Sequence, residues 1–163
     1  LAPLSPQAAM RIGESIGAAL PTPAMVDAIW NAATVKLGPD SIPPGPEMIT
    51  VPVFSRHNRM VRARRAANPA PLGALVAGHK KDVVVTPRLD SLPGRVAIYG
   101  WQKPDGSVIQ PLNTSHTTEH VDYSHGIRFV LDEVMVDGTP HELRMLLRDP
   151  LLAGLLSDEG PIR

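Results

Sequence analysis

The residues best suited to chemistry lie close together between Asn113 and Arg128. These sixteen residues include three of the six histidines in the chain, together with acidic, hydroxyl and tyrosine side chains. A core-facing segment would have to satisfy each of these polar groups individually, so packing alone does not explain their density. We therefore interpret the segment as the candidate reactive centre of the protein.

The first pattern in this segment indicates a metal site. His116-Thr-Thr-Glu-His120 matches H-x-x-E-H, the inverted form of a zinc-peptidase motif. On a helix, the two histidines would lie on one face as metal ligands, with Glu119 placed to activate water. The threonines and the Asn-Thr-Ser run before them favour a loop instead. On a loop, Asp122 or His125 becomes a further candidate ligand for zinc or another divalent ion, and a site without a cofactor is the alternative.

The second pattern, Val121-Asp-Tyr-Ser-His-Gly-Ile-Arg128, contains a candidate nucleophile. If a helix begins at Ser124, its hydroxyl lies near backbone amides and the positive end of the helix dipole, where an oxyanion is stabilised. Successive side chains diverge, so the general base must come from elsewhere, and His79 and His116 are the candidates. The alternative is that Ser124 only caps the helix and His125 bonds an internal carbonyl.

A further polar run, Gly78-His-Lys-Lys-Asp82, stands where a predicted strand begins. Side chains at a strand end are fixed but exposed, so this run could bind an anion or orient a base. The alternative is that the two lysines are solvated edge charges and Asp82 caps a turn. Together, the patterns predict catalytic roles for His79, His116, Asp122, Ser124 and His125, and substrate contacts from Lys80, Tyr123, Arg128 and Trp101.

Helical spacing is clearest in the N-terminal part of the chain. We predict helices over Ser5–Leu20, from a Thr22 N-cap through Ala33, and over Phe54–Ala67, with a proline-rich arm at 38–52. The third helix carries five arginines that either form a solvated face or hold an anionic ligand. His57 shares its side with Phe54 and Val61, so we predict a hydrogen-bonded core histidine.

Strand-like runs follow the third helix. Val83 to Val85 and Val96 to Trp101 are β-prone, and Lys103-Pro-Asp-Gly106 predicts an antiparallel hairpin to Ser107–Leu112. Residues 126–136 fit both helical and alternating spacing, and we predict a helix from Ser124 onwards. Helices are also expected from Thr139-Pro140 and from Asp149-Pro150.

These elements predict an α+β fold, in which N-terminal and C-terminal helices pack against a small antiparallel sheet. The length of 163 residues suits one domain, with a helical region at 1–68 and a sheet region at 72–163. Sixteen basic and sixteen acidic residues give no net field, which argues against a nucleic-acid partner. Neither a cysteine nor an apolar run long enough for a membrane span is present. The first residue is Leu1, so we expect a trimmed, secreted or periplasmic protein.

The order of Lys81–Thr86, Gly94–Gly100 and Val121–Val130 resembles circularly permuted papain-like hydrolases of the NlpC type. The resemblance implies a strand-borne histidine before a nucleophile that opens a helix. The position of the family's cysteine falls on Ser124, or on Tyr123 with a shift of one residue, and the histidine position reads Gly94-Arg95-Val96. The His-Lys-Lys-Asp and Tyr-Ser-His-Gly-Ile-Arg runs also resemble signatures of a bacterial secreted family of unassigned function.

The leading hypothesis is therefore an exported bacterial hydrolase that cleaves an amide or glycosidic bond in an envelope or extracellular polymer. His79 or His116 would act as general base, Ser124 or an activated water as nucleophile, and Arg128 with Lys80 would stabilise charge. One alternative is a non-catalytic module that binds an anion or glycan. Another is a zinc-dependent hydrolase that uses His116 and His120.

Overall fold

Two short helices open the computed structural model, which describes residues 4–163. Helix α1 covers Pro6–Ser15 and α2 covers Pro23–Ala32, and each begins with a capping hydroxyl followed by proline. The Thr22 hydroxyl accepts a hydrogen bond from Met25 N at 3.1 Å, as the predicted N-cap requires. Helix α1 ends before the predicted Leu20, because the chain turns at Gly17 and enters strand β1 at Ala18–Ala19.

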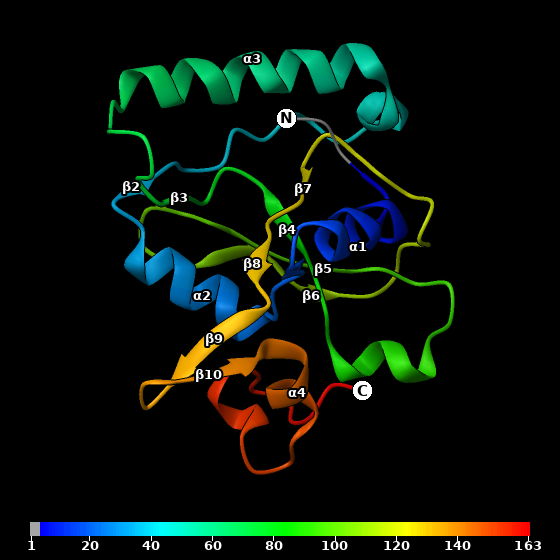
Figure 1. The fold of residues 1–163 in the computed structure, drawn as a ribbon. Helices are drawn as coiled ribbons and strands as arrows, with labels where there is room; N and C mark the ends of the chain where they lie inside the picture. Colours follow the sequence, from blue (N-terminus) through cyan, green and yellow to red (C-terminus); the bar gives the residue numbers. More distant parts are fainter. Residues whose placement is uncertain (1–3) are drawn as a thin grey trace.

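A four-stranded sheet in the order β6-β5-β4-β7 forms the centre of the fold (Figure 1). Its strands are β4 Lys81–Val84, β5 Ala97–Gln102, β6 Val108–Asn113 and β7 His125–Gly126. Strands β4, β5 and β6 pair antiparallel, which confirms the predicted hairpin, whereas β7 pairs parallel to β4. The parallel pairing sets Lys81 opposite His125 in register.

Three smaller pairs of strands surround this sheet. Strand β1 pairs with β8 (Val130–Leu131), β2 (Val35–Lys36) with β3 (Val76–Ala77), and β9 (Glu133–Val136) with β10 (Thr139–Glu142). The remaining helices are α3 Val51–Ala67 and α4 Leu143–Arg148, with short 3-10 turns η1 Pro46–Ile49, η2 Pro87–Ser91 and η3 Ala153–Leu155. Mixed helices and strands confirm the predicted α+β class.

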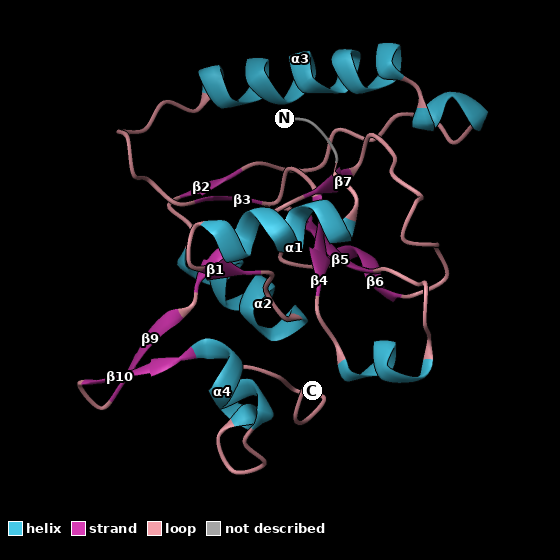
Figure 2. Ribbon diagram, turned by 45° about the vertical axis from the view of Figure 1, so that its right-hand side comes forward, coloured by secondary structure: helices cyan, strands magenta, loops and turns pink. Residues whose placement is uncertain are grey.

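The helices cover different parts of the sheet region. In both views α3 lies along one side of the molecule, while α4 and the C-terminus lie on the opposite side (Figures 1 and 2). Helix α2 packs on the sheet through Val26, which contacts Val84 and Ala97 in one apolar cluster. Among residues 4–163, no helix combines the length and the apolar character that a membrane span requires.

Three predictions about the C-terminal half are wrong. The helix expected from Ser124 through 136 is replaced by strands β7, β8 and β9. Residues Asp137 and Gly138 adopt φ of 49° and 80°, a left-handed pair that closes a tight β9-β10 hairpin, so Thr139-Pro140 lies in a strand and α4 begins at Leu143. The helix expected from Asp149 is reduced to the three residues of η3.

The predicted proline-rich arm at 38–52 overlaps the start of α3. This helix begins at Val51, three residues before the predicted start at Phe54.

Candidate metal centre

Three histidines from two segments meet beside strand β7. His116 and His120 come from the loop of residues 114–124, which we call the histidine loop, and His125 opens β7. One ring nitrogen from each of the three lies within 4.8 Å of the others. The rings of His116 and His120 stack with centroids 4.1 Å apart, and each centroid lies 5.8 Å from that of His125. We call His116, His120 and His125 the histidine cluster.

Backbone hydrogen bonds hold the histidine loop without a helix. Val96 N donates to the His116 carbonyl at 3.1 Å, and His120 N donates to the Thr117 carbonyl at 3.0 Å. The helical form of the His116–His120 motif is therefore wrong, and the loop form that was its alternative is the one observed. Because a tight turn replaces the helix, the two imidazoles still come together.

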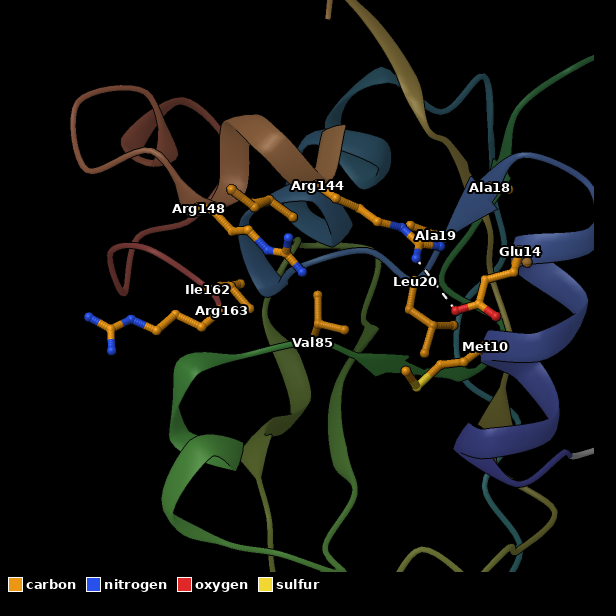
Figure 3. Close-up of a pocket in the computed structure, with 12 residues that line it drawn as sticks. Met10, Glu14, Ala18, Ala19, Leu20, Val85, Arg144, Arg148, Ile162 and Arg163 are labelled. Atoms are coloured by element: carbon orange, nitrogen blue, oxygen red, sulfur yellow. Dashed lines mark hydrogen bonds and ion pairs between the residues drawn. The ribbon is translucent and has the colours of Figure 1, made fainter. Parts of the chain in front are cut away.

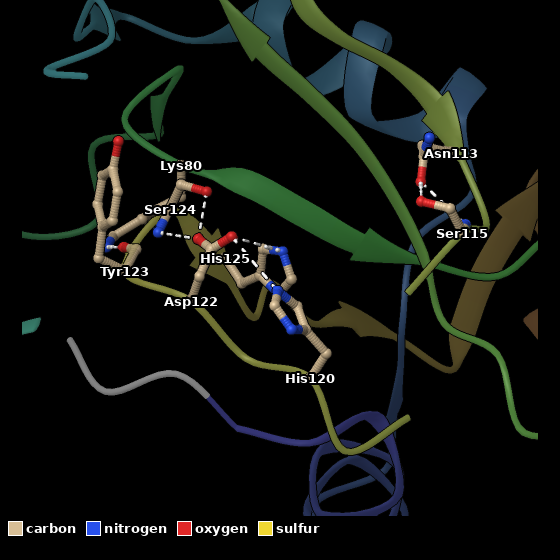
Figure 4. Close-up of polar contacts among 8 residues, drawn as sticks. All are labelled: Lys80, Asn113, Ser115, His120, Asp122, Tyr123, Ser124 and His125. Atoms are coloured by element: carbon tan, nitrogen blue, oxygen red, sulfur yellow. Dashed lines mark hydrogen bonds and ion pairs between the residues drawn. The ribbon is translucent and has the colours of Figure 1, made fainter. Parts of the chain in front are cut away.

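Asp122 presents one carboxylate oxygen to the histidine cluster. Its Oδ1 accepts hydrogen bonds from Ser124 N at 2.6 Å and from Ser124 Oγ at 2.5 Å, which fixes the carboxylate (Figure 4). Its Oδ2 lies 3.5 Å from His125 Nε2 and 3.8 Å from His120 Nε2. Both separations are too long for hydrogen bonds. They are close to the ligand-to-ligand spacing of about 3.4 Å that tetrahedral bonds of about 2.1 Å require.

Burial and neighbouring groups set the protonation states of the histidine cluster and Asp122. Burial lowers the pKa of His125 to about 4, although Asp122 partly opposes this. Burial, followed by the charge of His120, also lowers the pKa of His116. For Asp122, burial raises the pKa, but His125 and the hydrogen bonds from Ser124 outweigh it and hold the pKa below its usual value. At neutral pH the site thus holds an ionised carboxylate beside neutral imidazoles at His116 and His125.

The residues present fit a divalent metal ion. Neutral imidazoles and a carboxylate are the ligands that zinc and related ions prefer. His125 Nε2 is buried without a hydrogen-bond partner among the described residues, so its lone pair is available to a cation beside the Asp122 carboxylate. The His120 side chain is 33% exposed and that of His125 is 2% exposed, so the cluster opens to solvent on the His120 side. An open position is typical of catalytic rather than structural zinc sites.

A second group of polar side chains lies on the other side of the same loop. Lys80 Nζ is 2.8 Å from His57 Nδ1 and also donates to the Tyr123 carbonyl, and all three residues are buried. The rings of His57 and Tyr123 pack with centroids 4.8 Å apart. We call His57, Lys80, Tyr123 and Trp101 the lysine cluster. The prediction that His57 is a hydrogen-bonded core residue is confirmed.

The three residues predicted as substrate contacts in this cluster, Lys80, Tyr123 and Trp101, are buried, and their contact with a substrate stays a prediction. Their exposed fractions are 8%, 2% and 3%. The Tyr123 hydroxyl exchanges hydrogen bonds with the backbone of Ile42, and Tyr123 N donates to the Met48 carbonyl at 3.0 Å. The proline-rich arm therefore clamps the histidine loop in place, a role that its sequence did not indicate.

His79 and Arg128 belong to a third polar group. Arg128 Nε lies 3.5 Å from Asp82 Oδ2, and burial raises the pKa of Asp82 to about 6 while Arg128 opposes this. Burial, and then the charge of Arg128, lowers the pKa of His79 to about 4. His79 is thus a neutral histidine beside an arginine, outside the histidine cluster. Its role as a general base stays a prediction.

Ser124 sits differently from the predicted nucleophile. It lies in the turn before β7 rather than at a helix start, and it is fully buried. Its hydroxyl is already committed to Asp122. Lys81, by contrast, was not singled out as a site residue, yet its charge acts on His116, Asp122 and His125. The parallel pairing of Lys81 with His125 explains this proximity. No local sequence pattern predicts that pairing.

Comparisons with known proteins found no relative of this chain. No family model, curated protein sequence or solved structure matches this chain.

Proposed function

We propose that the protein is a metal-dependent hydrolase with a zinc-type divalent ion held by the histidine cluster. One observation carries the proposal: His120 and His125 direct Nε2 atoms to within 3.8 Å and 3.5 Å of one carboxylate oxygen of Asp122, with His116 stacked alongside. Four potential ligands that converge without direct hydrogen bonds among them are better explained by a shared cation than by packing.

The residues of the proposed metal centre would have separate roles. His116, His120 and His125 would hold the ion, and Asp122 Oδ2 would complete the ligand set or accept a bond from a water. A divalent ion held in this way supplies a Lewis acid and lowers the pKa of a coordinated water to about 7. Lys81 adds a positive charge beside the ligands, where negative charge develops during hydrolysis.

The open side of the centre supports the predicted class of substrate. The side chain of His120 is 33% exposed, so the ligand set is reached from the surface of the molecule. A polymer chain can lie along such a surface and bring one bond to the metal. We therefore retain an extracellular or envelope polymer, cleaved at an amide or glycosidic bond, as the proposed substrate.

Metal titration combined with hydrolysis assays tests the proposal. The purified protein, stripped with a chelator, is titrated with Zn²⁺ and Co²⁺, and its activity is measured on chromogenic amides and glycosides and on peptidoglycan. We expect one equivalent of bound metal and activity that metal restores. His116→Ala and His120→Ala should lose both, whereas His141→Ala, a histidine of β10 outside the cluster, should lose neither. Activity that survives chelation, or absence of stoichiometric metal, contradicts the proposal.

A second candidate function, binding of an anionic ligand without catalysis, is favoured by the composition of α3. This helix carries five arginines and no acidic residue. Arg64 pairs with Asp40, while Arg56 and Arg62 are exposed and form no ion pair with a described residue. Binding of a sulfated polysaccharide that falls in an Arg56→Gln/Arg62→Gln variant, but persists in His116→Ala, would support this function. Equal binding by all three proteins would exclude it.

A further inference from the structure

An apolar cavity lies between α1, β1 and α4, and no residue of the histidine loop lines it (Figure 3). Its volume is about 160 Å³. The buried part of its wall comes from Ala18, Leu20 and Leu147, which are 3%, 4% and 5% exposed. Ile162 closes one side, because its N–H donates to the Leu147 carbonyl at 2.7 Å and ties the chain to α4. Members of two apolar clusters therefore line the cavity.

Arginine side chains stand at the mouth of this cavity. Figure 3 shows the Arg148 side chain extending over the cavity toward Val85. Arg148 forms no hydrogen bond or ion pair with any residue that the structure describes. Arg144 is only loosely engaged, at 3.5 Å from Glu14 Oε1 and 3.4 Å from Asp132 Oδ2. An unpaired guanidinium above an apolar wall is complementary to a molecule with one apolar end and one anionic end.

We propose that this cavity is a binding site for a small amphiphilic monocarboxylate, with its hydrocarbon part inside the cavity and its carboxylate on Arg148. The volume sets the size, since an apolar cavity of about 150 Å³ holds one benzene ring. The ligand is thus an aliphatic or aromatic acid with about six carbons in its apolar part. Glu14, which pairs with Arg144, and Arg163 complete the charged lining of the cavity.

Guanidinium geometry accounts for the preference for a carboxylate. The planar fork of Arg148 matches two carboxylate oxygens, and Arg144 can add a second donor because its two ion pairs are long. Met10, half exposed at the rim, has a flexible thioether that can adapt to ligands of different shape. The site is independent of the proposed metal centre, since the two share no residue.

Titration of the methyl NMR signals of Ala18, Ala19, Leu147 and Ile162 tests the proposal. Four probes are compared: hexanoate, benzoate, hexanol and acetate. We expect saturable shifts with hexanoate or benzoate, and the tighter of the two tells whether the natural ligand is aliphatic or aromatic. Hexanol should bind about five- to tenfold more weakly than hexanoate, because it lacks the charge that Arg148 recognises. Acetate should not saturate.

Two variants and a control separate the apolar and charged parts of the site. Arg148→Gln should weaken hexanoate by about five- to tenfold and leave hexanol unchanged. Ala19→Phe, which fills the cavity, should abolish binding of both, and Lys103→Gln on the exposed β5-β6 turn should change neither. Equal binding of acetate and hexanoate, or of hexanol and hexanoate, overturns the proposal. If Ala19→Phe does not fold, an unchanged hexanoate affinity in Arg148→Gln overturns it alone.

Discussion

His57 and His125 are both buried histidines, yet their neighbours suit opposite roles. They expose 0% and 3% of their surface, and burial lowers the pKa of each to about 4. His57 Nδ1 faces the ammonium of Lys80 at 2.8 Å. His125 Nε2 faces the carboxylate of Asp122 at 3.5 Å, with the other two rings of the histidine cluster beside it.

The charge of the nearest neighbour separates these roles better than burial does. Each ring leaves one buried Nε2 without a hydrogen-bond partner among the described residues, so an unpaired nitrogen alone does not identify a ligand. An ammonium repels a divalent cation from His57, whereas a carboxylate attracts one to His125. The neighbouring charges therefore suit the lysine cluster to a hydrogen-bonded core, and they make the histidine cluster the candidate cation site.

The largest effect that we expect is the loss of zinc affinity when His125 is replaced. His125→Ala should weaken zinc binding by about a hundredfold to a thousandfold, since about four ligands share an apparent binding energy of roughly 10–16 kcal/mol. His57→Ala should leave the zinc affinity of the folded protein unchanged. Competition with a chromophoric chelator measures both values. Equal losses in the two variants would show that the distinction drawn from neighbouring charges is wrong.

Replacing Lys80 tests whether the lysine cluster stabilises the fold. Lys80→Met leaves His57 Nδ1 and the Tyr123 carbonyl without their donor, at about 1–3 kcal/mol each, while relieving the cost of burying an ammonium. We expect the free energy of unfolding to fall by about 2–3 kcal/mol in urea denaturation. Lys103→Met, on the exposed β5-β6 turn, is the matched control and should be neutral. A stabilised Lys80→Met would mean that desolvation dominates.

Acid sensitivity isolates the contribution of His57. Its pKa is about 4 in the folded protein and about 6.5 when unfolded, so the unfolded state binds more protons between these values. The stability that neutral His57 provides is complete above pH 6.5 and is lost as pH falls toward 4, about 2 kcal/mol of it by pH 5. The buried carboxyl of Asp82, with a folded pKa of about 6, acts in the opposite direction.

The measurement is the free energy of unfolding at pH 7.5 and pH 5 for the original protein and His57→Gln. The variant should lose about 2 kcal/mol less on acidification, since glutamine does not titrate in this range. Subtracting the two proteins cancels the contributions of Asp82 and of the other buried histidines. Identical pH dependence in both would mean that His57 is not kept neutral by its burial and its position beside Lys80.

Local signals in the sequence predicted several elements before the histidine loop well. The Thr22 cap, the β5-β6 hairpin turn and the buried face of α3 around His57 each depend on residues that are close in sequence. The stretch from Ile127 to Val136 fits helical and strand spacing equally. Long-range pairing decides it, since β8 pairs with β1 across more than a hundred residues and β7 joins β4. No local pattern carries that information.

The candidate site also combines features that local sequence predicts with features that depend on long-range contacts. Its location and the four potential ligands His116, His120, Asp122 and His125 could be predicted, because residue type and density alone point to them. Their arrangement could not, because it requires the turn that stacks two imidazoles and the arm that clamps Tyr123. The burial of Tyr123 and Trp101 could not be predicted for the same reason, since burial is a property of the whole fold, and their substrate contacts stay a prediction.

The smallest expected effect, at Ser124, separates a metal centre from a serine nucleophile. Ser124→Ala removes one of the two hydrogen bonds to Asp122 Oδ1, and Ser124 N keeps the carboxylate oriented. Stability should fall by about 1 kcal/mol, and zinc affinity should fall by about tenfold, the low end of the range for a lost partner of a ligand. Hydrolysis should persist, because the fully buried hydroxyl points to the carboxylate and not to solvent. Loss of turnover with zinc affinity unchanged would instead assign Ser124 to the reacting atoms, and Asp122 would then orient a nucleophile rather than a metal.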